Sequence, residues 1–479
     1  MIALNTNYKY LFKNIGLLTL SNFATKLISF FLVPLYTAVL TTEQYGTYDL
    51  FNTTVGVLIP ILSLNILEAV LRFGMDKNYS KDAIITVGSK WLGISTCFVF
   101  LVIVVNHFFT IIPILEKYKI YFFFMFFTQT LSGIVTAYSR GTDHVASLSV
   151  SSIIASVVTI GCNILFLIPF KWGLVGYFWA NILGPLAQCV YLIVRLKAWR
   201  HLNLKKKFVT QEKEMISYSS PLIANSISWW INNVSDRYIV TLFCGVAANG
   251  IYSVSTKIPS ILNILQTIFN QAWDLSAVRD FDPADKSGFF RNTYRAYNCL
   301  MVIVCSLIIA SDRILAKFLY LGKFYTAWKY VPFLTIAIVF GALTGYLGGF
   351  FTATKDSKAY ATSTIYGAVV NIILNFILIP IIGTLGASIS TAVCYIVVWL
   401  IRFFQSRKYI KIKINLIRDI ISYLLLILQT CVILFLPNNV LMYVIQLGLV
   451  AIIMLLYKND IILIVSKILD MLRKSNEYN

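Results

Sequence analysis

Polar side chains recur at helical spacing in two neighbouring apolar segments near the middle of the chain. Steps of three or four residues place such side chains on one face of a helix. The first segment carries Asn225, Ser228, Asn232 and Asp236, with Arg237 directly after. The second carries Ser253, Lys257, Ser260, Asn263, Thr267, Asn270 and Asp274. Amide, hydroxyl and ammonium groups in this pattern can bind hydroxyl groups and attract negative charge.

A third candidate is Lys26, which lies midway through the apolar segment 14–40 with Asn22 on the same face. A charge at the centre of a bilayer costs at least about 2.5–3.5 kcal/mol, so it normally faces a bundle interior or a water-filled cavity. Lys26 is roughly 12 residues from the inner end, about 18 Å at 1.5 Å per residue, which is deep for a side chain that must reach the surface. The stripes and Lys26 therefore predict a hydrophilic lumen inside a membrane protein.

The side chains of Asp236 and Arg237 must face different surroundings. Consecutive helical residues point about 100° apart, so the two side chains cannot both face the middle of a lumen. Asp236 continues the first stripe, and Lys257 lies at a similar depth on the second, so we predict an Asp236–Lys257 pair between the helices. A structural ion pair near the outer surface is the alternative interpretation.

The sequence holds no catalytic or metal-binding constellation. Its eight cysteines all lie in apolar segments without a CxxC pair, and its three histidines share no ligand spacing. We therefore expect no disulfide, no metal and no other cofactor. A glycine-rich phosphate loop is also missing from the sequence, which argues against ATP hydrolysis. These features predict a protein that is not an enzyme.

Composition defines the elements that must position these residues. The 479 residues are 58% hydrophobic and 13% charged, whereas a soluble domain is typically about 25% charged. We predict an all-α polytopic membrane protein, and about 14 segments approach the roughly 20 apolar residues that a span needs. These candidate spans are 14–40, 48–71, 84–111, 120–138, 146–169, 173–194, 216–243, 252–273, 294–312, 330–354, 359–381, 384–403, 419–436 and 440–457.

Basic residues indicate the orientation of the spans. The net charge of +20 comes from lysines and arginines that gather in alternate loops, above all in 195–215, as the positive-inside rule describes. This pattern places both termini in the cytoplasm and needs no nucleic-acid partner. The outer segment 313–329 is the exception, because it holds four basic residues among aromatics. We expect an interfacial helix there.

The chain also repeats itself. Tyr45–Tyr48 and Asn249–Tyr252 are similar turns after the first span of each half, and the later motifs Asn163…Gly173-x-x-Gly176 and Asn375…Gly383-x-x-Gly386 correspond. Asn371 and Asn375 share a face of the span 359–381. We predict two six-helix lobes, 1–212 and 213–405, around a central lumen, and a region 406–479 with a linker, two additional spans and a cytoplasmic tail. Internal repeats of this kind are typical of transporters.

With these motifs the chain resembles the polysaccharide transporter family, part of the multidrug/oligosaccharidyl-lipid/polysaccharide exporter superfamily. The resemblance is carried by the two turns, by Asn-Asn-x-x-Asp-Arg at 232–237, and by the opening SNFATKLISFFLVPLYTAVLTTEQYGTYDLF. That opening is similar to O-antigen and capsule repeat-unit flippases, and the resemblance covers nearly the whole chain. The additional helix pair resembles the one that forms a lipid groove in the lipid II flippase.

The resemblance implies a function in lipopolysaccharide or capsule biosynthesis. Such flippases move undecaprenyl-diphosphate-linked oligosaccharides from the inner to the outer leaflet of the bacterial plasma (inner) membrane by alternating access. It also implies as partners the lipid bilayer, a polysaccharide polymerase and chain-length proteins. We expect the substrate to contact the lumen residues that spacing selects, namely Asn22, Lys26, Asn232, Asp236, Arg237, Lys257, Asn263 and Asn371.

Two other functions stay open. A small-molecule exporter of the same superfamily that moves cations would present acidic residues to its substrate, whereas the deep charges here lean basic. A membrane O-antigen polymerase would need a large outer loop with basic catalytic residues, and the segment 313–329 is short. The energy source is open between an ion gradient and consumption of the product.

Overall fold

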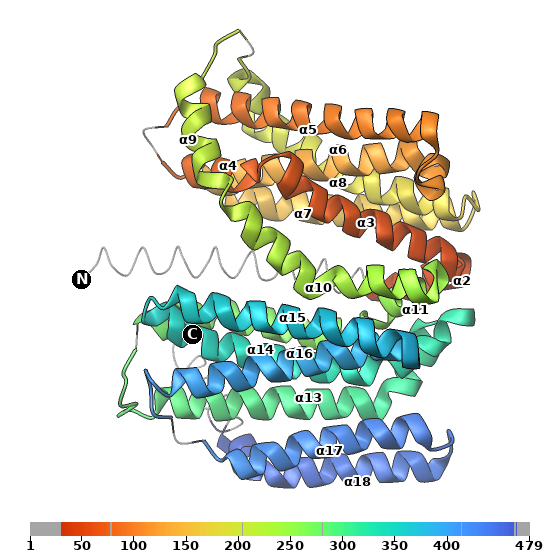
Figure 1. Ribbon diagram of the computed structural model, residues 1–479, viewed down its shortest axis with the longest axis vertical. Coiled ribbons are helices and arrows are strands. Elements are labelled where there is room, and N and C mark those ends of the chain that lie inside the picture. Colours follow the sequence, from red (N-terminus) through yellow and green to blue (C-terminus); the bar gives the residue numbers. More distant parts are fainter. Residues whose placement is uncertain are drawn as a thin grey trace, which may run out of the picture. The chain divides into compact units, whose positions relative to one another are not determined.

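The computed structural model describes residues 30–76, 79–203, 205–279, 281–412, 414–463 and 466, and all regular elements in these ranges are helices (Figure 1). Contacts divide the chain into two compact units, Met1–Tyr238 and Ile239–Asn479. The lobe boundary after residue 212 stays a prediction.

The first unit contains the helices α2 to α9 and most of α10. Local signals explain where several of them begin: Thr41 and Gln44 form a reciprocal capping box before α3, and Pro113 occupies the first turn of α6. The bounds are α2 Val33–Val39, α3 Thr42–Leu62, α4 Ile66–Gly74, α5 Lys81–Phe109, α6 Pro113–Gly141, α7 Val145–Leu167, α8 Leu174–Leu196, η1 Ala198–His201, α9 Val209–Ser219 and α10 Leu222–Cys244.

The second unit is built around α14, which is more buried than α13, α15, α16 or α17. The pair α17 and α18 lies side by side against α13 (Figure 1). The bounds are α11 Val246–Ser255, α12 Ser260–Arg279, α13 Phe289–Leu319, η2 Gly322–Lys329, α14 Val331–Ala353, α15 Ser357–Ile382, α16 Thr384–Ser406, α17 Leu416–Phe435 and α18 Val440–Leu456.

The apolar helices confirm a multi-pass membrane protein. In the described part of the chain, nine helices are long and apolar enough to cross a bilayer, or up to ten if the bent pair α3–α4 is one span. α18 is a shorter apolar helix, and α10 and α12, which carry the polar stripes, fall outside this set. The total of fourteen spans stays a prediction.

The repeated glycine motifs form the same structure in each unit. α8 begins after Gly173 and α16 after Gly383, and both glycines have a positive φ, +55° and +65°, which suits a residue without a Cβ. A Cβ on Gly176 would meet Phe166 Cβ at 2.7 Å, and one on Gly386 would meet the Leu378 carbonyl carbon at 2.6 Å. The glycines therefore permit the close packing of α7 on α8 and of α15 on α16.

Two predicted spans are broken in the structure. The span 48–71 bends by 64° between α3 and α4, where Leu64 and Asn65 both have a positive φ. The span 252–273 is interrupted at 256–259, because Pro259 supplies no N–H and disfavours helical backbone before it. The second polar stripe therefore lies on two helices, α11 and α12.

The predicted outer segment 313–329 begins within a span, because α13 continues to Leu319, and the short helix η2 then covers Gly322–Lys329. Arg313, counted in the sequence as a loop residue, is a helical residue with only 7% of its surface exposed. The Arg313 charge therefore lies in the interior of the second unit.

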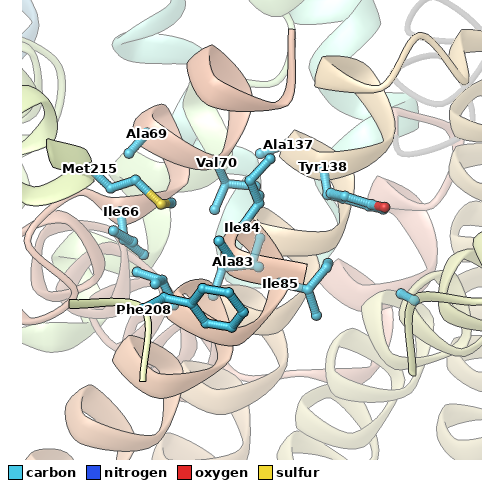
Figure 2. Close-up of a cluster of buried hydrophobic side chains, with 13 residues drawn as sticks. Ile66, Ala69, Val70, Ala83, Ile84, Ile85, Ala137, Tyr138, Phe208 and Met215 are labelled. Atoms are coloured by element: carbon cyan, nitrogen blue, oxygen red, sulfur yellow. The ribbon is translucent and has the colours of Figure 1, made fainter. Parts of the chain in front are cut away.

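The linker after α8 packs onto the first unit. Figure 2 shows Phe208 and Met215 of the linker among apolar side chains of α4, α5 and α6, such as Ile66, Ile84 and Tyr138. At the edge of this cluster both carboxylate oxygens of Glu212 lie 2.8 Å from Lys90 Nζ, and Trp91 Nε1 donates to the same carboxylate. The last residues of the predicted basic loop 195–215 thus form the start of a docked helix, α9, whereas Lys205, Lys206 and Lys207 lie outside the helices.

Candidate functional site

A buried ion pair joins α3 and α10 within the first unit. Arg237 Nη1 lies 2.5 Å from Asp49 Oδ1, and the two side chains are 18% and 7% exposed. Tyr48 and Tyr177, whose rings are 4.5 Å apart, interact electrostatically with the Asp49 carboxylate. A pair that is largely shielded from water depends strongly on both partners.

Further hydrogen bonds continue this contact along both helices. The hydroxyls of Thr54 and Tyr238 are 2.5 Å apart, and Trp230 Nε1 donates to the Thr53 carbonyl at 3.0 Å. At the other end of α3, where the backbone leaves helical geometry, Ser219 Oγ donates to the Leu64 carbonyl and Asn65 Nδ2 donates to Ser226 Oγ. The helix that carries the first predicted stripe is therefore held against α3 by a polar seam, which we call the α3–α10 seam.

The structure places the predicted residues of the first unit as follows. Asn22 and Lys26 lie outside the described residues. Asn232 is on α10, but its side chain lies outside the description. Asp236 is 8% exposed, and its Oδ1 accepts a hydrogen bond from the Arg237 backbone N–H at 2.9 Å. Arg237 forms an ion pair with Asp49, which was not among the predicted site residues.

In the second unit, Lys257 lies in the interruption between α11 and α12 and is partly exposed. The hydroxyl of Tyr320 accepts a hydrogen bond from the Ile258 N–H at 3.2 Å and reaches the Ser255 carbonyl at 3.5 Å, so it stabilises the broken backbone. Transporters use broken helices of this kind to present backbone groups and charges to polar solutes. Contact of Lys257 with an anionic group stays a prediction.

The remaining two predicted residues lie in different surroundings. Asn263 is exposed on α12. Asn371 is 2% exposed on α15, and its Oδ1 accepts a hydrogen bond from Asn375 Nδ2 at 3.0 Å. Substrate contact by either residue stays a prediction. Within the described ranges, no three His, Cys, Asp or Glu side chains converge in a way that could hold a metal ion.

The fold is similar to that of solved transporters of the MOP superfamily. The structure is similar to the lipid II flippase MurJ in an inward closed conformation, with TM-score 0.71 and 12% identity over 92% of this chain and 97% of that chain. An inward-facing multidrug resistance MATE family transporter gives TM-score 0.61 and 12% identity over 80% and 95%. A MOP superfamily transporter from Pyrococcus furiosus gives 0.51 and 14% over 82% and 95%.

The family follows from sequence. The profile described as "Polysaccharide biosynthesis protein" matches residues 11–274, more than half of the chain. The chain therefore belongs to this polysaccharide biosynthesis family. The search of the curated proteins gave no match. The solved structures to which its fold is similar are a flippase and a transporter, not enzymes.

Proposed function

We propose that this protein flips undecaprenyl-diphosphate-linked oligosaccharide repeat units from the inner to the outer leaflet of the bacterial plasma membrane, for O-antigen or related surface polysaccharide synthesis. One observation carries the proposal: a member of a polysaccharide biosynthesis family has a fold similar to that of a lipid II flippase over 92% of its length. The family supports a sugar and the fold supports a lipid carrier, so a sugar-bearing lipid is the substrate class that accounts for both similarities.

The residues suggest how the polar head of such a lipid is handled. The diphosphate would be attracted by Lys257, which lies in a helix break, and by Lys26. Arg237 already pairs with Asp49, so its part is to hold α10 in place. Amide and hydroxyl groups of the stripes would bind sugar hydroxyls without selecting one sugar. The polyprenyl tail would stay in the bilayer while the head crosses by alternating access.

The test is flipping by the purified full chain in proteoliposomes that contain an undecaprenyl-diphosphate oligosaccharide with a fluorescent label on the sugar. A membrane-impermeant quencher reports the fraction of label in the outer leaflet. We expect the wild type to equilibrate the label and Lys257→Gln to slow it at least tenfold. Lys355→Gln, which neutralises an exposed lysine of the same unit, is the matched control and should flip at the wild-type rate. Label that stays in its leaflet in vesicles that contain folded wild-type protein would contradict the proposal.

A parallel test in cells addresses Lys26. Lys26→Ala should stop export of surface polysaccharide at normal protein level, whereas Lys26→Arg should retain part of it because the charge is kept. Full export by the alanine variant would remove Lys26 from the mechanism.

A second candidate function is export of a small molecule, which the similarity to a multidrug resistance MATE transporter favours. Efflux of a fluorescent lipophilic cation from the same vesicles, without flipping of the labelled lipid, would establish this alternative. Flipping without efflux would establish the first proposal.

A further inference from the structure

A row of polar side chains is completely buried where α13, α17 and α18 meet in the second unit. Eight residues of this row are 0% exposed, and we call them the C-terminal seam: Asn298, Ser306 and Asp312 of α13, Asp419, Ser422 and Gln429 of α17, Gln446 of α18, and Tyr457 directly after it. Apolar helices that face lipid have no need of such groups. Ionisable residues within a membrane bundle normally mark ion pathways or proton relays.

Hydrogen bonds fix the register of the seam. Tyr423 Oη donates to Asn298 Oδ1 at 3.0 Å, and Arg313 Nη2 donates to the Leu436 carbonyl at 3.0 Å. α13 and α17 therefore run parallel, and this register brings Ser306 level with Gln429. Gln446 Nε2 donates to the Gln429 carbonyl at 2.8 Å, which aligns α18 with both helices.

One end of the seam is an ionic network in which the charges balance. Arg295 lies 2.6 Å from Asp460, and Arg418 pairs with both Asp460 and Asp419. The Tyr457 hydroxyl donates to Asp419 Oδ1 at 3.3 Å. Asp419 Oδ2 accepts no hydrogen bond of normal geometry from the described residues, and the buried Tyr294 hydroxyl lies close to the same carboxylate. This oxygen is therefore the one that can accept a proton or a water.

The middle of the seam is different, because most of its side-chain polar atoms lack partners among the described residues. Neither side-chain amide atom of Gln429, nor Gln446 Oε1, nor Ser306 Oγ, has a hydrogen bond to any residue that the structure describes. Each such group costs about 1–3 kcal/mol if it stays dry. Buried polar groups without protein partners are ordinarily satisfied by ordered water.

Asp312 forms the other end, and both of its carboxylate oxygens lack a hydrogen bond from the described residues. The neighbouring cation, Arg313, is directed elsewhere: its guanidinium lies 4.2 Å over the Trp328 ring and donates to the carbonyls of Ile433 and Leu436. Tyr443 of α18 is close enough to interact electrostatically with both Asp312 and Arg313. A buried carboxyl without hydrogen bonds to its charged form takes up a proton.

We propose that Asp312 is a proton-binding site and that the C-terminal seam is a hydrated path that connects it to the Asp419–Asp460 network. The proton leaves the Asp312 carboxyl for an adjacent water, passes along the waters held by Ser306, Gln429 and Gln446, and is accepted by Asp419 Oδ2. Ser422 and Gln429 are seven residues apart on one helix, about 10 Å, a gap that two or three waters span. The site lies wholly within the second unit. Its role would be to supply a proton as the coupling ion, whatever solute the chain moves.

The state of Asp312 is tested by infrared difference spectroscopy on the full chain in lipid nanodiscs at neutral pH. We expect a carboxylic-acid C=O band in the wild type that is lost in Asp312→Asn and displaced in Asp312→Glu. Size-exclusion profile and melting temperature verify that both variants fold. If the glutamate variant shows no displaced band, or the asparagine variant loses none, Asp312 is ionised and the proposal is wrong.

The path is tested by the rate at which that band shifts after transfer into D2O. Gln429→Leu removes the polar amide in the middle of the seam and should slow exchange at Asp312 at least tenfold. Ser149→Ala is the matched control, because it removes a buried hydroxyl that also lacks a described hydrogen-bond partner, but in the first unit. Equal rates in wild type and Gln429→Leu, or equal slowing by both variants, would rule out the seam as the path. Neither measurement uses the lipid-linked sugar, so its outcome is independent of the proposed flippase activity.

Discussion

Asp49 and Arg237, which are 188 residues apart in the sequence, form an ion pair of 2.5 Å between α3 and α10. Asp49 directly follows Tyr45–Tyr48, which the sequence predicts as a turn but which lies within α3. Arg237 directly follows the stripe that ends at Asp236. Two motifs that are far apart in the sequence therefore meet in one contact. Any conformational step that moves α10 along or away from α3 must break this pair.

The pair can be tested by a double-mutant cycle on melting temperature and on export. Removing one partner of a buried pair leaves the other charge uncompensated, at a cost of about 3–5 kcal/mol for a fully buried pair. Arg237 is 18% exposed, so we expect less than this from Asp49→Asn and Arg237→Gln singly, and partial recovery in the double variant.

The exposed pair Lys90–Glu212 provides the control for this cycle. Lys90 is 52% exposed, and such pairs contribute about 0–1 kcal/mol, so Lys90→Gln should barely change the melting temperature. Strictly additive losses for Asp49→Asn and Arg237→Gln would show that the pair is not coupled.

Tyr320→Phe should destabilise the second unit. The substitution keeps the ring but removes the hydroxyl that accepts from the Ile258 N–H in the break between α11 and α12. A buried donor that loses its acceptor costs about 1–3 kcal/mol, which a melting curve in detergent can resolve. Tyr366→Phe, at an α15 side chain that is 61% exposed, is the control. Equal melting temperatures for the two variants would mean that Tyr320 does not support the break.

Local patterns made most of the helices predictable. The span expected at 173–194 is α8, Leu174–Leu196. Its continuous apolar segment is bounded by a glycine at one end and by a basic loop at the other, so both ends of the helix can be read from the sequence. The same holds for 359–381, which is α15, Ser357–Ile382. The repeated glycines mark close helix contacts in both units. These features depend on neighbouring residues alone.

The features that the sequence does not predict depend on contacts between residues that are far apart in the chain. The break at 256–259 was missed because apolar residues continue through it, and Tyr320, which stabilises it, comes some sixty residues later. Asp49 was passed over because a carboxylate at the edge of a span is ordinarily interfacial, and only the fold brings Arg237 to it. Asp312 and Arg313 were treated as the end of a span and the start of a loop, although α13 buries both.

Acid should destabilise the loop before α15. Asp356 caps that helix by accepting from the Ala359 N–H at 3.0 Å, and the Tyr409 hydroxyl donates to the same carboxylate. The Tyr409 hydrogen bond and then the capping bond hold the pKa of Asp356 below its ordinary value. A carboxyl with a lowered pKa stabilises the fold above its unfolded pKa, about 3.9, and this contribution is lost as the pH falls through the lowered value.

Tyr409→Phe is the variant that tests this effect. It should lower the melting temperature at pH 7, and the difference from the wild type should shrink as the pH falls toward about 3, below the ordinary Asp pKa. The exposed Tyr366→Phe is again the control. A difference that stays constant between these pH values would mean that Tyr409 acts without Asp356.

Topology is open to labelling with an impermeant thiol reagent in intact cells. In a variant without the eight native cysteines, a cysteine at Asn438, between α17 and α18, should react from outside. A cysteine at Lys206, in the basic linker, should react only after the cells are opened, because positive loops stay in the cytoplasm. Reaction at position 206 in intact cells would reverse the proposed orientation.

The predicted coupling of Asp236 and Lys257 distinguishes two roles for the lysine. If Lys257 neutralises Asp236, then Asp236→Asn and Lys257→Gln each impair export strongly, because each leaves one charge uncompensated. The double neutral variant and the charge swap, Asp236→Lys with Lys257→Asp, then recover part of the loss, and the interaction term of the cycle is the measured quantity. If instead Lys257→Gln abolishes export and Asp236→Asn restores none of it, the ammonium acts on the substrate. The position of Lys257 in a helix break suits direct contact with a diphosphate, and the pairing hypothesis would then be abandoned.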